Sequence, residues 1–105
     1  MGTKNKPGEF DCYANAEPDE PMFILLARDP LAPLLVSLWA KMRQKLDYGE
    51  DKLKIDEAIN CVGEMRLWMT LNRPNKNYEF AENAFSSVIV EESIAIAFDT
   101  SASIL

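Results

Sequence analysis

The amino-acid sequence predicts a mainly helical α+β fold, and three observations support this. Residues 31–48 and 52–72 space their apolar side chains as amphipathic helices do. Only a few residues separate these two stretches, so the helices are expected to run antiparallel as a hairpin. Residues 86–98 are rich in β-branched side chains, which favours a short β-hairpin. The length of 105 residues fits a single domain, with the helical hairpin at 30–73.

The segment before the first helix is predicted to have little regular structure. Residues 1–9 contain two glycines, one proline and several polar side chains, and are expected to be flexible. Pro18 and Pro21 favour an extended path, because each fixes its own φ and biases the preceding residue away from helix. Residues 22–27 form an apolar run of strand length. This run is expected to pack against the hairpin, as a strand or as an unpaired extended segment.

Both helices carry sequence signals at their ends. Asp29 can cap the first helix, and Gly49 suits its C-terminal end. Asp51 suits the positive end of the second helix dipole, and Pro74 ends that helix. Cys61 is expected to be a small core residue. The remaining core is expected to comprise Phe23, Leu25, Leu35, Leu38, Trp39, Met42, Leu46, Ile55, Ala58, Val62, Met65 and Met69.

The second helix also has apolar residues on its opposite face. Leu53 and Leu67 lie there, away from the main stripe. Either the C-terminal segment packs on this face, or another protein binds it. Gly63 lies in mid-helix, where it costs about 1 kcal/mol relative to Ala, so a close backbone approach on its side is expected.

Two structures compete for the C-terminal third. The alternation of apolar residues over 94–98 favours a half-buried strand. A helix through 78–98 is the alternative, because apolar residues from Phe80 to Val88 keep helical spacing. We favour the strand.

The composition argues against several classes of function. The net charge is −6, whereas nucleic-acid binding relies on Lys and Arg, so direct contact with nucleic acid is not expected. The absence of His excludes Ser-His-Asp and Cys-His catalysis and every His-containing zinc site. Cys12 and Cys61 cannot supply four zinc ligands and are expected to be free thiols. We therefore expect a protein that is not an enzyme and that uses no metal and no cofactor.

The chain is also expected to act away from membranes. No stretch approaches the about 20 apolar residues that a spanning helix needs, and residues 1–10 do not resemble a secretory signal. The sequence is acidic over 1–29 and 77–105 and slightly basic over 30–76. A cytoplasmic location is the expectation.

Three charged residues flank the apolar run 22–27. Asp19 and Glu20 precede it, and Arg28 follows it. Arg28 is expected to pair with a loop acid such as Asp19. With Leu53 and Leu67, these three residues are our candidates for binding a partner.

The same region carries a resemblance to a known family. Its pattern is Asp19-Glu20-Pro21-x-Phe23, then Arg28-Asp29-Pro30-x-Ala32-Pro33-x-Leu35-Val36-x-x-Trp39-Ala40, and finally Met65-Arg66-x-Trp68. This pattern resembles a family of small proteins found in phage and prophage genomes, over roughly residues 10–74. The resemblance implies a setting, that of an accessory protein acting in the cytoplasm of a bacterial host.

These observations lead to one functional expectation and two alternatives. We expect a non-enzymatic protein that binds a host or phage protein, and inhibition is one form that such binding takes. The first alternative is an oligomeric sponge for a nucleotide signal, using Arg28, Lys52, Lys54 or Arg66. The second is an inhibitor whose acidic ends mimic nucleic acid. We also expect a homodimer, with residues 86–105 and the Leu53/Leu67 face in the contact.

Overall fold

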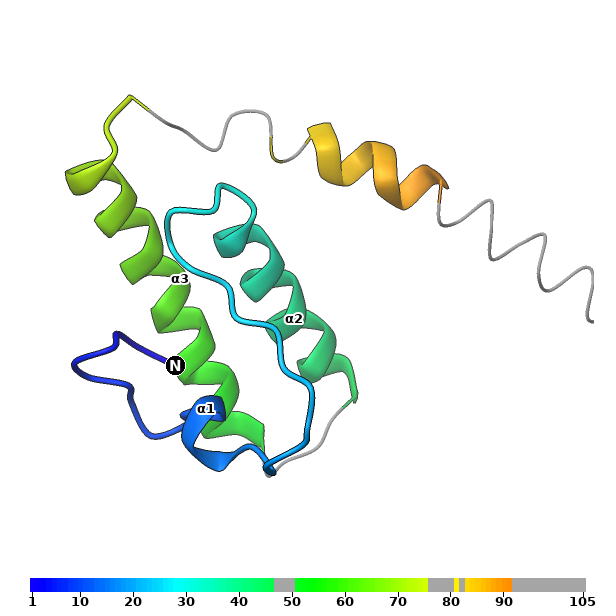
Figure 1. Ribbon diagram of the computed structural model, residues 1–105. Helices are drawn as coiled ribbons and strands as arrows, with labels where there is room; N and C mark the ends of the chain where they lie inside the picture. The colour runs from blue at the N-terminus through cyan, green and yellow to red at the C-terminus, as the bar shows by residue number, and fades with distance from the viewer. Residues whose placement is uncertain (47–50, 76–80, 82, 92–105) are drawn as a thin grey trace, which may run out of the picture.

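The computed structural model describes residues 1–46, 51–75, 81 and 83–91, and these residues fold as helices joined by irregular segments. The helices are α1 (Cys12–Asn15), α2 (Ala32–Leu46) and α3 (Lys52–Asn72). Residues 83–91 are also helical. Helices α2 and α3 lie side by side and run antiparallel, which confirms the predicted hairpin (Figure 1).

The predicted α+β class is wrong for the part of the chain that the structure describes, because that part contains no strand. Residues 86–91 of the predicted β-hairpin are helical, and 92–98 lie outside the described residues. A helix satisfies its backbone hydrogen bonds locally, whereas a strand needs a second strand beside it. The helical spacing of the apolar residues before Val88 therefore outweighs the β-branched composition.

Helix α2 begins as its sequence predicts. The Asp29 carboxylate accepts a 2.9 Å hydrogen bond from the Leu31 N–H, and the Asp29 carbonyl accepts one of 3.0 Å from Ala32. Pro33 is buried in the first turn, where its missing N–H costs nothing. Arg43 and Lys45 lie in the last turn, where a positive charge interacts favourably with the helix dipole.

Helix α3 has the predicted bounds, but its first residue is stabilised differently. Asp51 occupies the N-cap position without a side-chain hydrogen bond to the helix. Its carboxylate instead forms an ion pair of 2.5 Å with Arg43. The pair joins the end of α2 to the start of α3. At the other end of α3, Arg73 closes the helix by donating its N–H to the Met69 carbonyl at 2.8 Å.

The interface between α2 and α3 has two alanines in its buried cluster. Ala40, Ile55 and Ala58 form its buried cluster, and Val36 and Trp39 pack against them. Ala58 is 0 % exposed. Alanines at these positions let the two backbones approach closely, which large side chains would prevent.

The core prediction is confirmed in α3 and only partly confirmed elsewhere. Four of its members are buried, namely Ile55, Ala58, Val62 and Met69. Four others are half-buried, namely Leu25, Leu38, Trp39 and Met65. Cys61 is buried as predicted. The prediction is wrong for four exposed residues: Phe23, Leu35, Met42 and Leu46. In α2 the residues that belong to the cluster with α3 or pack against it are Val36, Trp39 and Ala40.

The chain before α2 contains the short helix α1 and an irregular segment that runs along the hairpin (Figure 1). Asp11 caps the short helix α1, accepting hydrogen bonds from the N–H groups of Tyr13 and Ala14. Residues 17–31 then run back along the hairpin, from the end where α3 begins to the end where α2 begins (Figure 1). No helix within the described ranges is long and apolar enough to cross a membrane.

Candidate functional site

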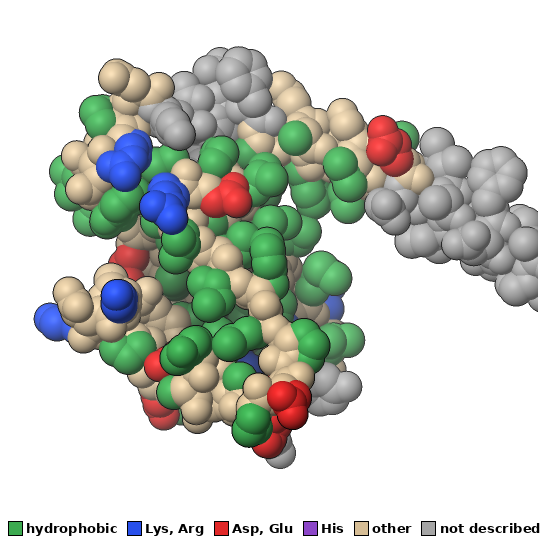
Figure 2. Space-filling view, viewed as in Figure 1, with side chains coloured by type: hydrophobic (Ala, Val, Ile, Leu, Met, Phe, Trp, Pro, Cys, Tyr) green, Lys and Arg blue, Asp and Glu red, His purple; other side chains and the backbone are tan. Residues whose placement is uncertain are grey.

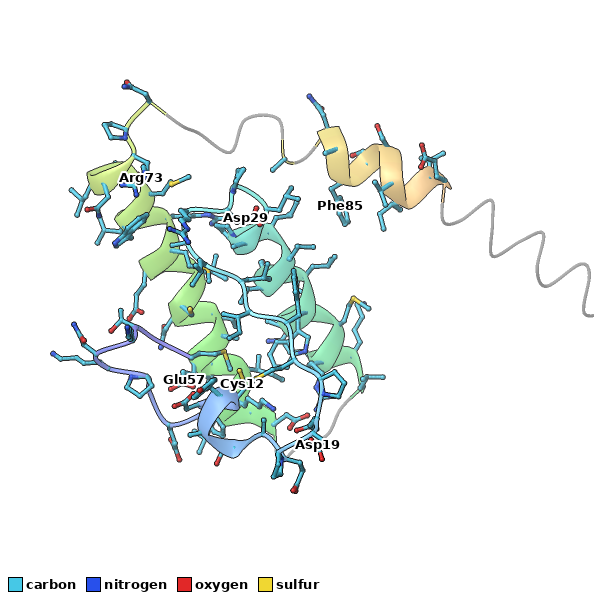
Figure 3. The ribbon with its side chains drawn as sticks, viewed as in Figure 1. Cys12, Asp19, Asp29, Glu57, Arg73 and Phe85 are labelled. Atoms are coloured by element: carbon cyan, nitrogen blue, oxygen red, sulfur yellow. The ribbon has the colours of Figure 1, made fainter. Side chains whose placement is uncertain are left out.

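The structure does not gather the charged candidate residues into one site. Asp19 and Arg28 lie at opposite ends of the extended segment, as the labels of Asp19 and Asp29 show (Figure 3). All three candidates, Asp19, Glu20 and Arg28, are exposed. Among the described residues, no ion pair joins Arg28 to Asp19, so that expectation is wrong. The extended backbone between them prevents the contact, because each extended residue adds about 3.3 Å.

Leu53 and Leu67 are exposed on α3, as predicted for its outer face. They are fourteen residues apart, which corresponds to about 21 Å along the helix. Residues of the N-terminal segment contact the helix surface between them, at Glu57. Leu53 and Leu67 therefore belong to two separate patches rather than to one.

Glu57 is the residue that attaches the N-terminal segment to α3. Its carboxylate accepts hydrogen bonds of 2.7 Å from the Glu9 N–H and 3.0 Å from the Phe10 N–H. The Met1 ammonium lies 3.3 Å from the same carboxylate and also donates to the Phe10 carbonyl. The Met1 side chain packs against the core between α2 and α3. Glu57 thus binds both ends of the loop formed by residues 1–10.

The hydrogen bonds and the ammonium change the acidity of Glu57. Partial burial of this carboxyl acts to raise its pKa. The N–H groups of Glu9 and Phe10 and the charge of Met1 act in the opposite direction and outweigh burial. The net effect is a lowered pKa. The ionised form of the Glu57 carboxylate, which accepts these hydrogen bonds, is therefore favoured.

An open pocket of about 380 Å³ lies between the N-terminal segment and α3. Its charged lining groups are the Met1 ammonium, Lys6, Glu57 and Glu64, and the buried Cys61 lies at its wall. Burial and the nearby charge of Glu64 raise the pKa of the Cys61 thiol. This thiol is therefore protonated and poorly nucleophilic.

Sequence analysis missed Glu57, although the glycines of the N-terminal segment indicate that this segment approaches another part of the chain. Glu57 lies in α3 between Leu53 and Leu67 along the chain. Gly2 and Gly8 both have positive φ, and a side chain at Gly8 would overlap the Glu57 carboxylate. Glycines within a segment expected to be flexible thus mark its close approach to the helix.

The outer patch, which we define as Leu67, Trp68 and Leu71, lies near the C-terminal end of α3. Leu67 is 60 % exposed and Leu71 71 % exposed. The Arg73 guanidinium lies 5.2 Å from the centre of the Trp68 ring, over its face. Tryptophan and arginine are enriched among the residues that contribute most of the binding energy of protein interfaces. Figure 2 shows apolar side chains, in green, on this end of the molecule and over the hairpin.

The basic residues considered for a nucleotide do not form one cluster. Lys52 and Lys54 lie at the start of α3, and Lys54 lies 5.9 Å from the Trp39 ring. Arg66 lies about 18 Å further along the helix, counting twelve residues. Within the described ranges, no three side chains of the metal-binding types come close enough to hold an ion.

Comparisons with models of known protein families, with curated proteins and with solved structures find no match to this chain. The resemblance to small phage proteins therefore stays a prediction.

Proposed function

We propose that this chain is a non-enzymatic accessory protein of the phage type that acts in the bacterial cytoplasm by binding another protein. The observation that carries this proposal is the outer patch on α3, where Leu67, Leu71 and, to a smaller extent, Trp68 are exposed within the described part of the chain. The resemblance of residues 10–74 to small phage proteins supports the setting.

The chemistry of the patch indicates what its partner presents. Leu67 and Leu71 are one helical turn apart and project from the same side of α3. An apolar recess on the partner would cover both. The Arg73 guanidinium, held over Trp68 at the edge of this patch, would then meet a carboxylate at the rim of that recess. If that recess is the partner's own active or binding site, covering it would inhibit the partner.

The experiment is recovery of the protein from bacterial cells, followed by native mass spectrometry of the intact complex. The native chain is expected to carry one partner at a fixed stoichiometry, and the double variant Leu67→Asp/Leu71→Asp is expected to lose it. Met42→Asp is the matched control, because Met42 is also an exposed apolar residue but lies on α2. Circular dichroism verifies that both variants remain helical. Retention of the partner by the double variant, or its loss from both variants, overturns the proposal.

A further inference from the structure

The extended segment 22–26 has backbone groups that nothing in the described chain uses. The N–H and C=O groups of Met22, Phe23, Ile24 and Leu25 form no hydrogen bond there. The segment is held at both ends. Before it, the Glu17 N–H donates to the Glu20 carboxylate at 3.1 Å, and after it the Asp29 N–H donates to the Leu26 carbonyl at 2.9 Å. A fixed extended backbone with unpaired polar groups is a template for a second strand.

The side chains of this segment are exposed as well. Phe23 is 83 % exposed, and Met22, Ile24 and Leu26 are each about half exposed. Burial of such side chains against another surface is favourable, by about 25 cal/mol for each Å² removed from water. The segment therefore offers both main-chain hydrogen bonds and apolar area to whatever pairs with it.

We propose that two copies of this chain dimerise by pairing residues 22–26 antiparallel about a two-fold axis. Full overlap of the five residues places Ile24 opposite Ile24 of the other copy, Met22 opposite Leu26, and Phe23 opposite Leu25. Met22, Ile24 and Leu26 then exchange N–H···O=C bonds. The Leu26 carbonyl has a second lone pair for this purpose. Pro21, which has no N–H, falls at a position that faces away from the partner, so the register leaves no donor missing.

Charge complementarity selects a second copy over an unrelated strand. An antiparallel arrangement brings Arg28 of one copy to the end where Asp19 and Glu20 of the other lie. All three side chains are exposed, and Arg28 has no ion pair within the described residues. One oxygen of Glu20 accepts the Glu17 N–H, which leaves the other for the guanidinium. The two-fold axis forms this contact twice.

This dimer contact differs from the one expected from the sequence, which used residues 86–105 and the Leu53/Leu67 face. It does not involve the outer patch of α3 and stands whether or not that patch binds a partner.

Sedimentation equilibrium of the full chain at about 100 μM tests the dimer and its main-chain pairing. The native chain is expected to be mostly dimeric. Ile24→Pro removes the N–H that faces the partner, whereas Ile24→Ala removes only side-chain area. Because the Ile24 N–H has no hydrogen bond within one described chain, both variants are expected to fold. We expect Ile24→Pro to raise the dimer Kd at least about tenfold more than Ile24→Ala does.

A second pair of variants tests the charge contact. Arg28→Glu is expected to weaken the dimer at least about tenfold, since it meets Asp19 and Glu20 with like charge. Arg66→Glu makes the same change of charge at an exposed arginine of α3 and is expected to leave the dimer intact. A monomeric native chain, equal effects of the two Ile24 variants, or equal effects of the two arginine variants overturns the inference.

Discussion

The backbone N–H of Glu9 donates a 2.7 Å hydrogen bond to the carboxylate of Glu57, which lies 48 residues later in the chain. The Phe10 N–H and the Met1 ammonium share the same carboxylate. One side chain on α3 thus binds three donors of the N-terminal segment. Because each donor would otherwise need a separate acceptor, Glu57 has a large effect on the stability of this segment.

Glu57→Gln is expected to lower the free energy of unfolding by about 2 kcal/mol, since hydrogen bonds to a charged group contribute about 1.5–3 kcal/mol. The amide retains one acceptor oxygen but loses the charge and turns an NH₂ group toward other donors. Urea denaturation followed by circular dichroism measures the change. Glu64→Gln is the control, because Glu64 lines the same pocket on α3. An equal loss in both variants would show that the contacts of Glu57 add nothing.

Stability is also expected to depend on pH through Glu57. Burial acts to raise its pKa in the folded protein, but the donors favour the ionised form and hold the pKa below its ordinary value. A lowered folded pKa means that the contribution is fully present above the ordinary pKa and is lost as pH falls through the lowered value. Urea denaturation at several values from about pH 7 to about pH 3 should show a shallower fall for Glu57→Gln than for the native chain. Parallel curves would contradict this assignment.

Two glycines are expected to respond in opposite ways to substitution by alanine. Gly8 has φ of +81°, and a Cβ there would overlap the Met1 carbonyl and the Glu57 carboxylate. Gly8→Ala should therefore destabilise the protein by about 1–2 kcal/mol or more. Gly63 lies in mid-helix, and no atom of the described residues lies within 4 Å of an added Cβ, so these residues do not make the close approach expected there. Gly63→Ala should stabilise the protein by up to about 1 kcal/mol in thermal or urea denaturation.

Alanine substitutions of two methionines from the predicted core should differ clearly in their effect on stability. Met69 is 1 % exposed, so Met69→Ala is expected to cost about 2–5 kcal/mol. Met42 is 59 % exposed, and Met42→Ala is expected to change stability by less than about 1 kcal/mol. Equal losses in denaturant midpoints would mean that the buried face of α2 differs from the one described.

The helices were predictable because their signals are local. Asp29 and Arg73 lie within a few residues of the ends that they determine, and the buried side of α3 follows from its own spacing. The buried side of α2 was not predictable in this way. A count of large apolar residues favours Leu35, Met42 and Leu46, whereas the buried residues of α2 are Ala32, Pro33 and Ala40.

The remaining errors concern contacts over long distances in the chain. Glu57 and its donors are separated by 47 to 56 residues, and no local pattern links them. The C-terminal strand prediction relied on β-branched composition and on the alternation of apolar residues over 94–98, neither of which can tell whether a partner strand exists. Of the candidate site, the exposure of Leu53 and Leu67 was predictable, but the N-terminal segment that separates them was not.

The Glu57 contacts also have a consequence for the order of folding. Helices α2 and α3 are joined by a short connection, so their interface needs little loop closure and can form early. The bonds from Met1, Glu9 and Phe10 close a much longer loop, and an acceptor on α3 is in place only after that helix exists. The N-terminal segment is therefore expected to attach after the rate-limiting barrier. A substitution that weakens the contacts of Glu57 should then accelerate unfolding while leaving the refolding rate nearly unchanged.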